Sequence, residues 1–430
     1  MRLPLAIIIT LFVGSILADF YIWLDIRQGK SRNRWALSNA YAISSFILWI
    51  FLGVTVALPR RGLDGGVYAI MWMLTVYLSI YIPKIIYCLF SIIGRIPLVF
   101  RSKRWTWLNY VGGILGIIGF ALVWHGILYT RTHTQLVNLT VNSEKLPDSF
   151  DGYRIVQISD LHLGTWGNDT RFLSEFVNTI NNLRPDLIVF TGDLVNQKAE
   201  EVKPFTKLLS KLEASDGVYS ILGNHDYGDY VDWPSKEAKI ENLETLKKLQ
   251  AEAGWKMLNN QHDFIVKSKN GRRDSIAVIG VENWGEPPFG KYGDLKAAYP
   301  VEKERSIKDK NFKILLTHNP EHWVQEVRKI SNIDLSLSGH THAMQMSFDA
   351  FGKRYSPSAL RYKTWGGFYT ENGIGEIEDF GNPDTYGGLD RNLEHPSLYV
   401  NIGAGEVGMP FRIGASNPEI TLITLKKKKH

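Results

Sequence analysis

Cysteine is nearly absent from this chain of 430 residues, which contains only Cys88. A single cysteine excludes an intramolecular disulfide framework and a zinc site built from cysteines. The sequence also lacks an internal repeat of recognised period. It has neither the aromatic signature of an RNA-recognition domain nor a basic helix, so we expect no nucleic-acid partner. The mild formal net charge of +6 instead fits a membrane protein with basic loops.

Charged residues are missing from two long runs, 35–58 and 106–129, which contain no Asp, Glu, Lys or Arg. Each run exceeds the roughly 20 residues that cross about 30 Å of hydrocarbon. With two further apolar stretches, the sequence predicts four transmembrane helices at about residues 3–24, 35–58, 66–93 and 106–129. The third could end early, because Pro83 and Lys84 can interrupt a helix. A signal peptide is the alternative for the first, but no small-residue cleavage site opens into a soluble domain.

The distribution of Lys and Arg between the loops predicts the orientation. With four spans, the first and third loops lie on one side and carry eight basic residues: Arg27, Lys30, Arg32, Arg34, Arg95, Arg101, Lys103 and Arg104. The opposite side carries four: Arg2, Arg60, Arg61 and Arg131. We therefore expect the first side to be cytoplasmic and the chain after the fourth helix to face outward. One helix more or fewer would reverse this orientation.

Beyond residue 150, five short apolar runs each end in Asp, Asn or His. The runs with their polar ends are 155–158 with Asp160 and His162, 187–190 with Asp193, 218–222 with Asn224 and His225, 312–316 with His318, and 335–338 with His340 and His342. Such runs are typical of buried strands, and open α/β sheets bind ligands at the carboxyl ends of their strands. One Asp-x-His pair alone is more often turn chemistry. Five such ends, with oxygen and imidazole groups that suit a divalent metal, indicate one shared site.

The order of these motifs (Asp-x-His, Gly-Asp, Gly-Asn-His-Asp, a lone His, Gly-His-x-His) resembles the calcineurin-like metallophosphoesterase superfamily. The phrase Ser-Asp-Leu-His-Leu-Gly at 159–164 is similar to the opening of its bacterial membrane-associated branch. The resemblance covers about residues 140–425. It implies an α/β fold, a four-layer αββα sandwich, here preceded by an all-α four-helix transmembrane region. The expected parts are a transmembrane region (1–130), a linker with the first strand (131–150), the catalytic domain (151–425) and a basic tail (426–430).

The resemblance also implies two divalent metal ions, and Mn²⁺, Fe²⁺/Fe³⁺ and Zn²⁺ all suit the residues present. Matched motif by motif, Asp160, His162 and His342 would hold the first metal, Asn224, His318 and His340 the second, and Asp193 would bridge them. A hydroxide between the metals would attack phosphorus. His225, beside Asn224 in the catalytic set, would face the leaving group. Asp226 is expected to order the turn instead of binding metal.

His225 lacks one partner that the resemblance leads us to expect. In the protein-phosphatase branch an Asp three residues after the bridging Asp supports this histidine, and an Arg follows it. Here the two positions are Asn196 and Gln197. Strong acid catalysis and protein substrates are therefore disfavoured, and a leaving group that needs little protonation, such as a phosphate in a pyrophosphate bond, is favoured.

Four segments outside the motifs carry further expectations. Residues 135–141 alternate like an edge strand. Residues 361–369, basic and aromatic with two glycines, either grip a lipid-linked or nucleotide-linked phosphate or pack into the core, and the sequence leaves both open. Residues 371–396 resemble an insertion or flap. The lysines at 426–429 form a solvated terminus or contact anionic lipid.

Together these features predict a membrane-anchored dinuclear-metal phosphoesterase of a bacterial inner membrane. It would hydrolyse a phosphodiester, phosphomonoester or pyrophosphate bond in an envelope or lipid-linked substrate, with the catalytic domain in the periplasm. Its partners would be that substrate and the lipid bilayer, with no protein partner. One alternative is a UDP-2,3-diacylglucosamine pyrophosphatase of the lipid A pathway, whose substrate is cytoplasmic. Another is a transporter or sensor with an inactive domain, which the complete ligand set and the absence of paired intramembrane charges disfavour.

Overall fold

The computed structural model describes residues 5–29, 31–58, 66–287, 290–299, 311–330, 332–351, 353–372, 376–379 and 389–428. The chain forms two compact units. The helical unit comprises Met1–Tyr129 and Gly408–Phe411. The α/β unit comprises Thr130–Val407 and Arg412–His430.

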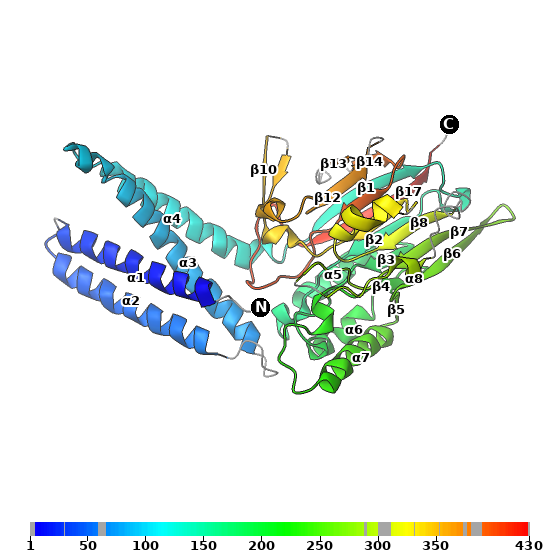
Figure 1. The fold of residues 1–430 in the computed structure, drawn as a ribbon, viewed down its shortest axis with the longest axis horizontal. Helices are drawn as coiled ribbons and strands as arrows, with labels where there is room; N and C mark the ends of the chain where they lie inside the picture. Colours follow the sequence, from blue (N-terminus) through cyan, green and yellow to red (C-terminus); the bar gives the residue numbers. More distant parts are fainter. Residues whose placement is uncertain are drawn as a thin grey trace. The chain divides into compact units, whose positions relative to one another are not determined.

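The helical unit contains four long helices (Figure 1). They are α1 (Leu5–Gln28), α2 (Arg34–Ala57), α3 (Gly66–Ile93) and α4 (Trp107–His125). Each lies in a segment long and apolar enough to cross a membrane. A helix satisfies its own backbone groups in lipid, where no water is available to do so. The predicted membrane region with four spans is confirmed, although Arg2, Lys30, Arg60 and Arg61, which entered the orientation argument, lie outside the described residues.

Helix α3 continues through Pro83, and close packing against α4 accompanies this. A Cβ added at Gly116 would lie 3.1 Å from the carbonyl oxygen of Pro83, and one at Gly112 would lie 3.2 Å from Tyr87 Cα. The two glycines are four residues apart on α4 and face α3. This small-residue spacing lets two helix backbones approach closely in a membrane.

The helical unit also contains an ion pair, so the prediction that its spans lack paired charges is wrong. Lys84 Nζ lies 2.8 Å from Asp19 Oδ1, and Asp19 is 3% exposed. The same carboxylate accepts hydrogen bonds from Tyr41, Trp49 and Tyr81. Four donors from α2 and α3 thus surround one acceptor on α1. The arrangement ties three helices together and leaves the carboxylate little capacity for a passing ion.

Two seven-stranded sheets form the centre of the α/β unit. The first has the order β14 (Leu389–Asn392), β1 (Gln135–Ser143), β17 (Glu419–Lys427), β2 (Arg154–Ile158), β3 (Leu187–Phe190), β4 (Val218–Ser220) and β5 (Trp255–Met257). The second has the order β13 (Ile377–Asp379), β12 (Gly367–Glu371), β15 (Ser397–Val400), β9 (Leu335–Ser338), β8 (Phe312–Leu316), β7 (Arg272–Gly280) and β6 (Gln261–Lys269). A small third sheet contains β11 (Lys353–Tyr355), β10 (Met346–Ala350) and β16 (Ile413–Gly414).

The two large sheets pack face to face through a shared hydrophobic core. Val137 and Val189 of the first sheet and Ile314 and Leu337 of the second belong to this core, and each is at most 1% exposed. These residues face inward because strand side chains alternate between the two faces of a sheet.

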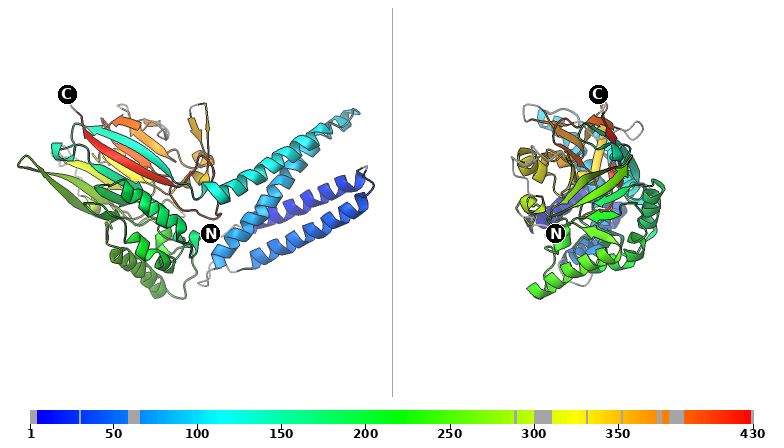
Figure 2. Two further views of the ribbon diagram at one scale, coloured as in Figure 1. Left: turned by 180° about the vertical axis from the view of Figure 1, so that it is seen from behind. Right: turned by 90° about the vertical axis from the view of Figure 1, so that its right-hand side faces the viewer.

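Helices cover the outer faces. Those on the first sheet are α5 (Arg171–Asn182), α6 (Thr206–Leu209) and α7 (Lys236–Glu252), which gather along one side in Figures 1 and 2. Helix α5 buries Phe172, Phe176 and Ile180, which recur at helical spacing. On the second sheet, Trp323 of η7 (Trp323–Val327) is fully buried. The expected αββα sandwich is confirmed.

Strand β1 corrects one expectation. It was predicted to be an edge strand, but it pairs with β17 on one side and with β14 on the other. The outer strand β14 comes from the stretch 371–396 that resembled an insertion, of which 373–375 and 380–388 lie outside the described residues. Short strands in a polar segment give little periodic signal, so the covering strand was missed.

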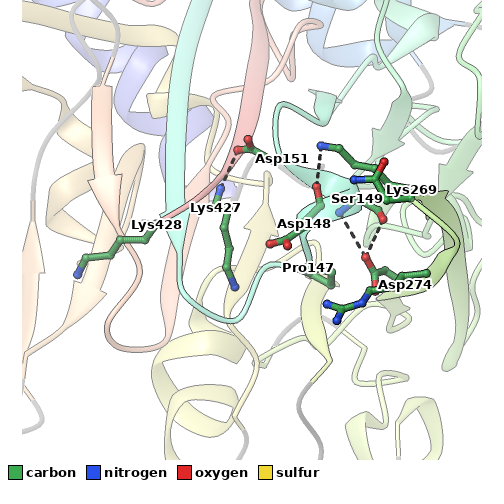
Figure 3. A pocket seen from close by; sticks show the side chains of 10 residues that line it. Pro147, Asp148, Ser149, Asp151, Lys269, Asp274, Lys427 and Lys428 are labelled. Atoms are coloured by element: carbon green, nitrogen blue, oxygen red, sulfur yellow. Dashed lines mark hydrogen bonds between the residues drawn. The ribbon is translucent and has the colours of Figure 1, made fainter. Parts of the chain in front are cut away.

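The basic tail predicted at 426–430 is also shorter than expected. Lys426 and Lys427 are the last residues of β17, and Lys428 Nζ donates to Glu394 at 3.1 Å. Lys427 and Lys428 line a polar pocket of about 900 Å³ with carboxylates that include Asp151 (Figure 3). The Lys428 side chain therefore pairs with an acidic group within the unit, and Lys427 Nζ donates to the backbone carbonyl oxygen of Glu144. Positions 429 and 430 lie outside the described residues.

Candidate metal centre

The polar clusters predicted at strand ends all follow parallel strands. β2, β3 and β4 are parallel neighbours in the first sheet, and β8 and β9 are parallel neighbours in the second. Parallel strands present their carboxyl ends at the same edge of a sheet. The seven predicted ligand residues follow these five ends, and the structure brings them together: Asp160, His162, Asp193, Asn224, His318, His340 and His342.

One group contains Asp160, His162 and His342. The Nε2 atoms of His162 and His342 are 3.1 Å apart, and His342 Nε2 lies 3.2 Å from Asp160 Oδ1. All three side chains are buried, at 5% exposure or less. Their ligand atoms therefore point at one small volume.

A second group contains Asp193, His318 and His340. His318 Nε2 lies 3.1 Å from Asp193 Oδ2 and 3.2 Å from His340 Nδ1. The side-chain oxygen of Asn224 lies 3.1 Å from the same His318 nitrogen. Asn224 is held in this orientation because its amide nitrogen donates to the Tyr230 hydroxyl at 2.8 Å.

Asp193 is within reach of both groups. Its Oδ2 lies 3.1 Å from His318 Nε2 in the second group and 3.6 Å from His162 Nε2 in the first. Its other oxygen accepts the backbone N–H of His225 at 2.8 Å, which fixes the carboxylate between the two groups.

The donor set fits divalent cations. Ring nitrogens 3.1–3.2 Å apart can share at most one proton per contact, so at least one nitrogen of each pair presents a lone pair to the site. Among the described residues, Nδ1 of His162 and of His342 has no hydrogen-bond partner although both atoms are buried. Imidazole and carboxylate donors are typical ligands of transition-metal ions.

The protonation states fit the same conclusion. Burial lowers the pKa of His162 well below its usual value, and burial beside His318 lowers that of His340 to about 3. Burial opposes ionisation of Asp193, but His318 outweighs it and holds the pKa of this carboxyl well below its usual range. Burial likewise opposes charge on His318, yet the Asp193 carboxylate raises its pKa to about 9. His318 is thus the ring from which a cation must displace a proton.

The backbone at the site is strained. Five of the seven residues have a positive φ: Asp160 (54°), His162 (42°), Asp193 (60°), His340 (76°) and His342 (52°). Each such residue costs on the order of 1 kcal/mol or more and persists only where its surroundings enforce it. Strain concentrated on these ligand residues marks a functional site.

Asp226 orders the loops beneath the site. Its carboxylate accepts the backbone N–H groups of Asp193 and Gly223, each at 2.9 Å, and also that of Leu194. It therefore joins the loop after β3 to the loop after β4. Asp226 does not belong to either group of converging ligand atoms among the described residues.

His225 has a different partner from the one expected at position 196. Its Nδ1 lies 2.7 Å from the backbone carbonyl oxygen of Asn196, to which it donates. The Asn196 side chain instead contacts the hydroxyl of Thr165. Glu201 holds this loop in place, since its carboxylate accepts the Asn196 N–H at 2.6 Å. Sequence reasoning missed Glu201, and its only signal is its place in the first turn of a short helix.

The sequence left open whether the segment 361–369 grips a phosphate or packs into the core, and the structure shows that its residues differ in this respect. The Tyr362 hydroxyl lies 3.0 Å from His340 Nε2, at the rim of the site. Trp365, Phe368 and Tyr369 are buried at 7%, 1% and 1% exposure and belong to hydrophobic clusters. These three aromatic side chains are therefore core residues, and only Tyr362 reaches the site.

Comparison with known proteins agrees with both units. Residues 153–344 match the family described as calcineurin-like phosphoesterase. Residues 1–131 match the family described as probable calcineurin-like phosphoesterase, transmembrane domain. The first match contains all seven converging residues.

Individual relatives span one or both units. The chain is 31% identical over 292 residues to the uncharacterized metallophosphoesterase YkuE of Bacillus subtilis, covering 67% of this chain and 84% of YkuE. It is 29% identical over 322 residues to a transmembrane protein with metallophosphoesterase domain of Danio rerio, covering 72% of this chain and 62% of that protein, less than two thirds of its length. It is 29% identical over 244 residues to the UDP-2,3-diacylglucosamine pyrophosphatase LpxG of Chlamydia muridarum, covering 49% of this chain and 71% of LpxG.

The converging Asp, Asn and His residues, the four apolar helices and these matches lead to one conclusion. The chain belongs to the calcineurin-like phosphoesterase family and is a membrane-associated, metal-dependent phosphoester hydrolase.

Proposed function

We propose that the site holds two divalent metal ions. Asp160, His162 and His342 would hold one, Asn224, His318 and His340 the other, and Asp193 would be shared. The observation that carries this proposal is the position of the Asp193 carboxylate, 3.1 Å and 3.6 Å from a ring nitrogen of each group. Mn²⁺, iron and Zn²⁺ all suit this set of ligands.

Two such ions, when bound, supply Lewis acidity and a water-derived nucleophile at neutral pH. The chain's own residues set up that chemistry. Asp193 and Asp160 are ionised and fixed by backbone N–H groups, and the buried walls keep the local dielectric low. These residues would therefore hold the bound cations in fixed positions, so that little reorganisation of the protein would be needed when a phosphate enters.

His225 would orient the leaving group. Its Nδ1–H donates to a backbone carbonyl, so Nε2 is the ring atom left for a substrate. A carbonyl stabilises a charged imidazole less than a carboxylate does, and burial lowers the pKa of His225. In the neutral ring Nε2 is an acceptor, so His225 can donate to a leaving oxygen only when it is protonated and is poorly suited to strong acid catalysis. This supports a substrate whose leaving group needs little protonation, such as a diphosphate.

The proposed substrate is a phosphoester or pyrophosphate of a lipid-linked envelope compound. Four membrane spans keep the enzyme at a bilayer, and LpxG, a similar protein, is named for a pyrophosphatase of an acylated nucleotide sugar. The second candidate is that same UDP-2,3-diacylglucosamine pyrophosphatase activity. Its substrate is cytoplasmic, so orientation separates the two.

The α/β unit is proposed to face the periplasm of a bacterial inner membrane, because the first and third loops carry more Lys and Arg than the opposite side. Alkaline phosphatase and a fluorescent protein fused after Tyr129 test this. Strong phosphatase activity supports an outward domain. Fluorescence with inactive phosphatase would overturn it and favour the cytoplasmic pyrophosphatase.

The function is tested with the full chain in detergent. Metal content is measured, and rates are compared on a phosphodiester, a phosphomonoester lipid and an acylated nucleotide diphosphate. We expect two metal ions per chain and hydrolysis that Asp193→Asn abolishes, while the exposed Asp169→Asn behaves as the parent. A chain that stays metal-free when offered manganese or zinc would refute the proposal.

A further inference from the structure

The α/β unit exposes large apolar side chains mostly in one place. Of nine that are exposed among its described residues, five lie between positions 344 and 360. Phe351 and Leu360 are 98% and 93% exposed, more than any other large apolar side chain that the structure describes. We call this group the apolar hairpin surface: Met344, Phe348, Phe351, Tyr355 and Leu360. Clustered exposure of this kind marks an interaction surface, whereas single exposed side chains need no explanation.

The register of the hairpin sorts its residues by face. In the antiparallel pair of β10 and β11, Phe348 lies opposite Tyr355 and Asp349 lies opposite Arg354. Cross-strand partners share a face, and neighbours along a strand alternate. The aromatic pair is therefore on one face, and the Asp349–Arg354 ion pair, 2.7 Å long, is on the other. Phe351 follows β10 directly at the tip.

The charges around this surface are mostly positive. Lys353, Arg361 and Lys363 are exposed. Asp349, the one carboxylate between positions 344 and 363, is paired with Arg354, and Arg361 lies 3.9 Å from Glu286, which leaves Lys353 and Lys363 as the main source of positive charge. Apolar side chains with basic residues beside them are typical of elements that lie in the head-group region of a membrane. Each Lys or Arg near an anionic membrane adds about 1 kcal/mol of attraction.

The same segment joins directly to the metal centre. It begins two residues after His342, and the Ser356 hydroxyl donates to the Ala343 carbonyl oxygen at 2.7 Å. At its far end, the Tyr362 hydroxyl lies 3.0 Å from His340 Nε2. The apolar hairpin surface and the ligand histidines are thus parts of one continuous piece of chain.

We propose that the apolar hairpin surface inserts into the bilayer head-group region and brings the metal centre to lipid-borne phosphates. The occupant is a lipid bilayer with anionic head groups, as the exposed basic residues require. The chain passes from Thr130 to β1 in four residues, so a bilayer is the surface available to the α/β unit at all times. The proposal that the surface brings the metal centre to lipid-borne phosphates rests on the proposed function. The proposal that the surface inserts into the bilayer does not.

Insertion is tested with the full chain in nanodiscs of neutral and anionic phospholipid. Cys88, the only cysteine, is replaced by Ala, and single cysteines at Phe351, Leu360 and Ile240 carry a nitroxide label. Ile240, 61% exposed on α7, is the matched control. Collision rates with oxygen, which concentrates in lipid, and with a water-soluble nickel chelate report the depth of each label.

We expect labels at 351 and 360 to favour oxygen and the label at 240 to favour the nickel chelate. Labels at 351 and 360 that are as accessible to the chelate as the label at 240 would overturn insertion and leave the surface for a protein partner. This readout requires no catalysis, so its failure is distinct from failure of the proposed function.

An activity measurement then tests delivery. In Phe351→Ser/Leu360→Ser, the ratio of the rate on a vesicle-borne phosphate lipid to that on a soluble phosphodiester should fall about tenfold, which corresponds to the loss of about one buried apolar side chain. Ile240→Ser should leave the ratio unchanged. An unchanged ratio in the double variant would overturn delivery.

Discussion

The carboxylate of Asp226 accepts the backbone N–H of Asp193 at 2.9 Å, so a residue outside both groups of converging side chains fixes the backbone of Asp193, which lies within reach of both. The same side chain accepts the N–H of Gly223, in the loop that carries Asn224. Two ligand-bearing loops from different strands therefore share one buried acceptor. Such supporting contacts commonly change metal affinity or activity by about 10–100-fold when they are removed.

Asp226→Asn should weaken the site without removing a ligand. The asparagine amide would direct its own N–H groups at backbone N–H donors, which leaves at least one donor unpaired and costs on the order of 2 kcal/mol. We expect metal affinity to fall by about 10–100-fold. Isothermal titration of the metal-stripped full chain measures this. Asp169→Asn, which alters only an exposed ion pair with Arg171, is the matched control, and equal affinities in the two variants would contradict the prediction.

Removal of metal should lower the thermal stability of the α/β unit. Asp160, Asp193 and four histidines lie close together in two groups, and all of them except His318 have a positive φ, so the site is costly to keep folded when no cation compensates it. A ligand at about 100 times its Kd stabilises by about 2.7 kcal/mol, so a chelator should lower the Tm by several degrees. Differential scanning calorimetry measures the shift. Asp193→Asn should show a smaller shift, and an unchanged Tm in the parent protein would count against a metal in this site.

The helical unit offers a prediction of its own in the Asp19–Lys84 pair. Lys84→Met leaves a buried carboxylate without its cation, and breaking such a pair costs about 3–5 kcal/mol. Asp19→Leu with Lys84→Met removes both charges and should cost less than the sum of the single changes. The free energy of unfolding of the full chain in mixed micelles is measured by circular dichroism for the parent, the single variants and the double variant. Strictly additive costs would mean that the two charges do not interact.

The sequence predicted the parts of this protein that depend on local pattern. The four spans follow from uncharged apolar runs, and α2 (Arg34–Ala57) lies within one residue of its predicted range. The convergence of the seven proposed ligand residues was predictable because each lies two to four positions after a buried strand, and parallel strands bring their ends together. Hydropathy does not fix the rotation of a helix, so the contact of Asp19 with Lys84, 65 positions apart, left no local signal.

The contacts that support the site were harder to predict. Asn196 was considered for its side chain, yet its backbone carbonyl is the group that meets His225. The Tyr230 hydroxyl orients Asn224, and Glu201 holds the loop of Asn196, but neither lies in a motif. Such contacts depend on loop conformation, and the loops here take positive φ values that propensities do not predict.

The role of His225 can be separated from that of the ligands by varying the leaving group. Because Nδ1–H of His225 donates to a carbonyl, Nε2 can donate to the leaving oxygen only when the ring is protonated. Burial lowers the pKa of His225, so we expect a weak contribution to protonation of the leaving group. His225→Ala should then slow alkyl phosphodiesters by less than the roughly 100-fold typical of full acid catalysis, and acidic leaving groups such as nitrophenol still less, so that the dependence of rate on leaving-group pKa becomes only slightly steeper. His395→Ala, at an exposed histidine, is the control and should match the parent. If plots of rate against leaving-group pKa had the same slope for the parent and His225→Ala, His225 would not act on the leaving group. Metal content should be unchanged in His225→Ala, because His225 is in neither ligand group, and this distinguishes it from Asp193→Asn.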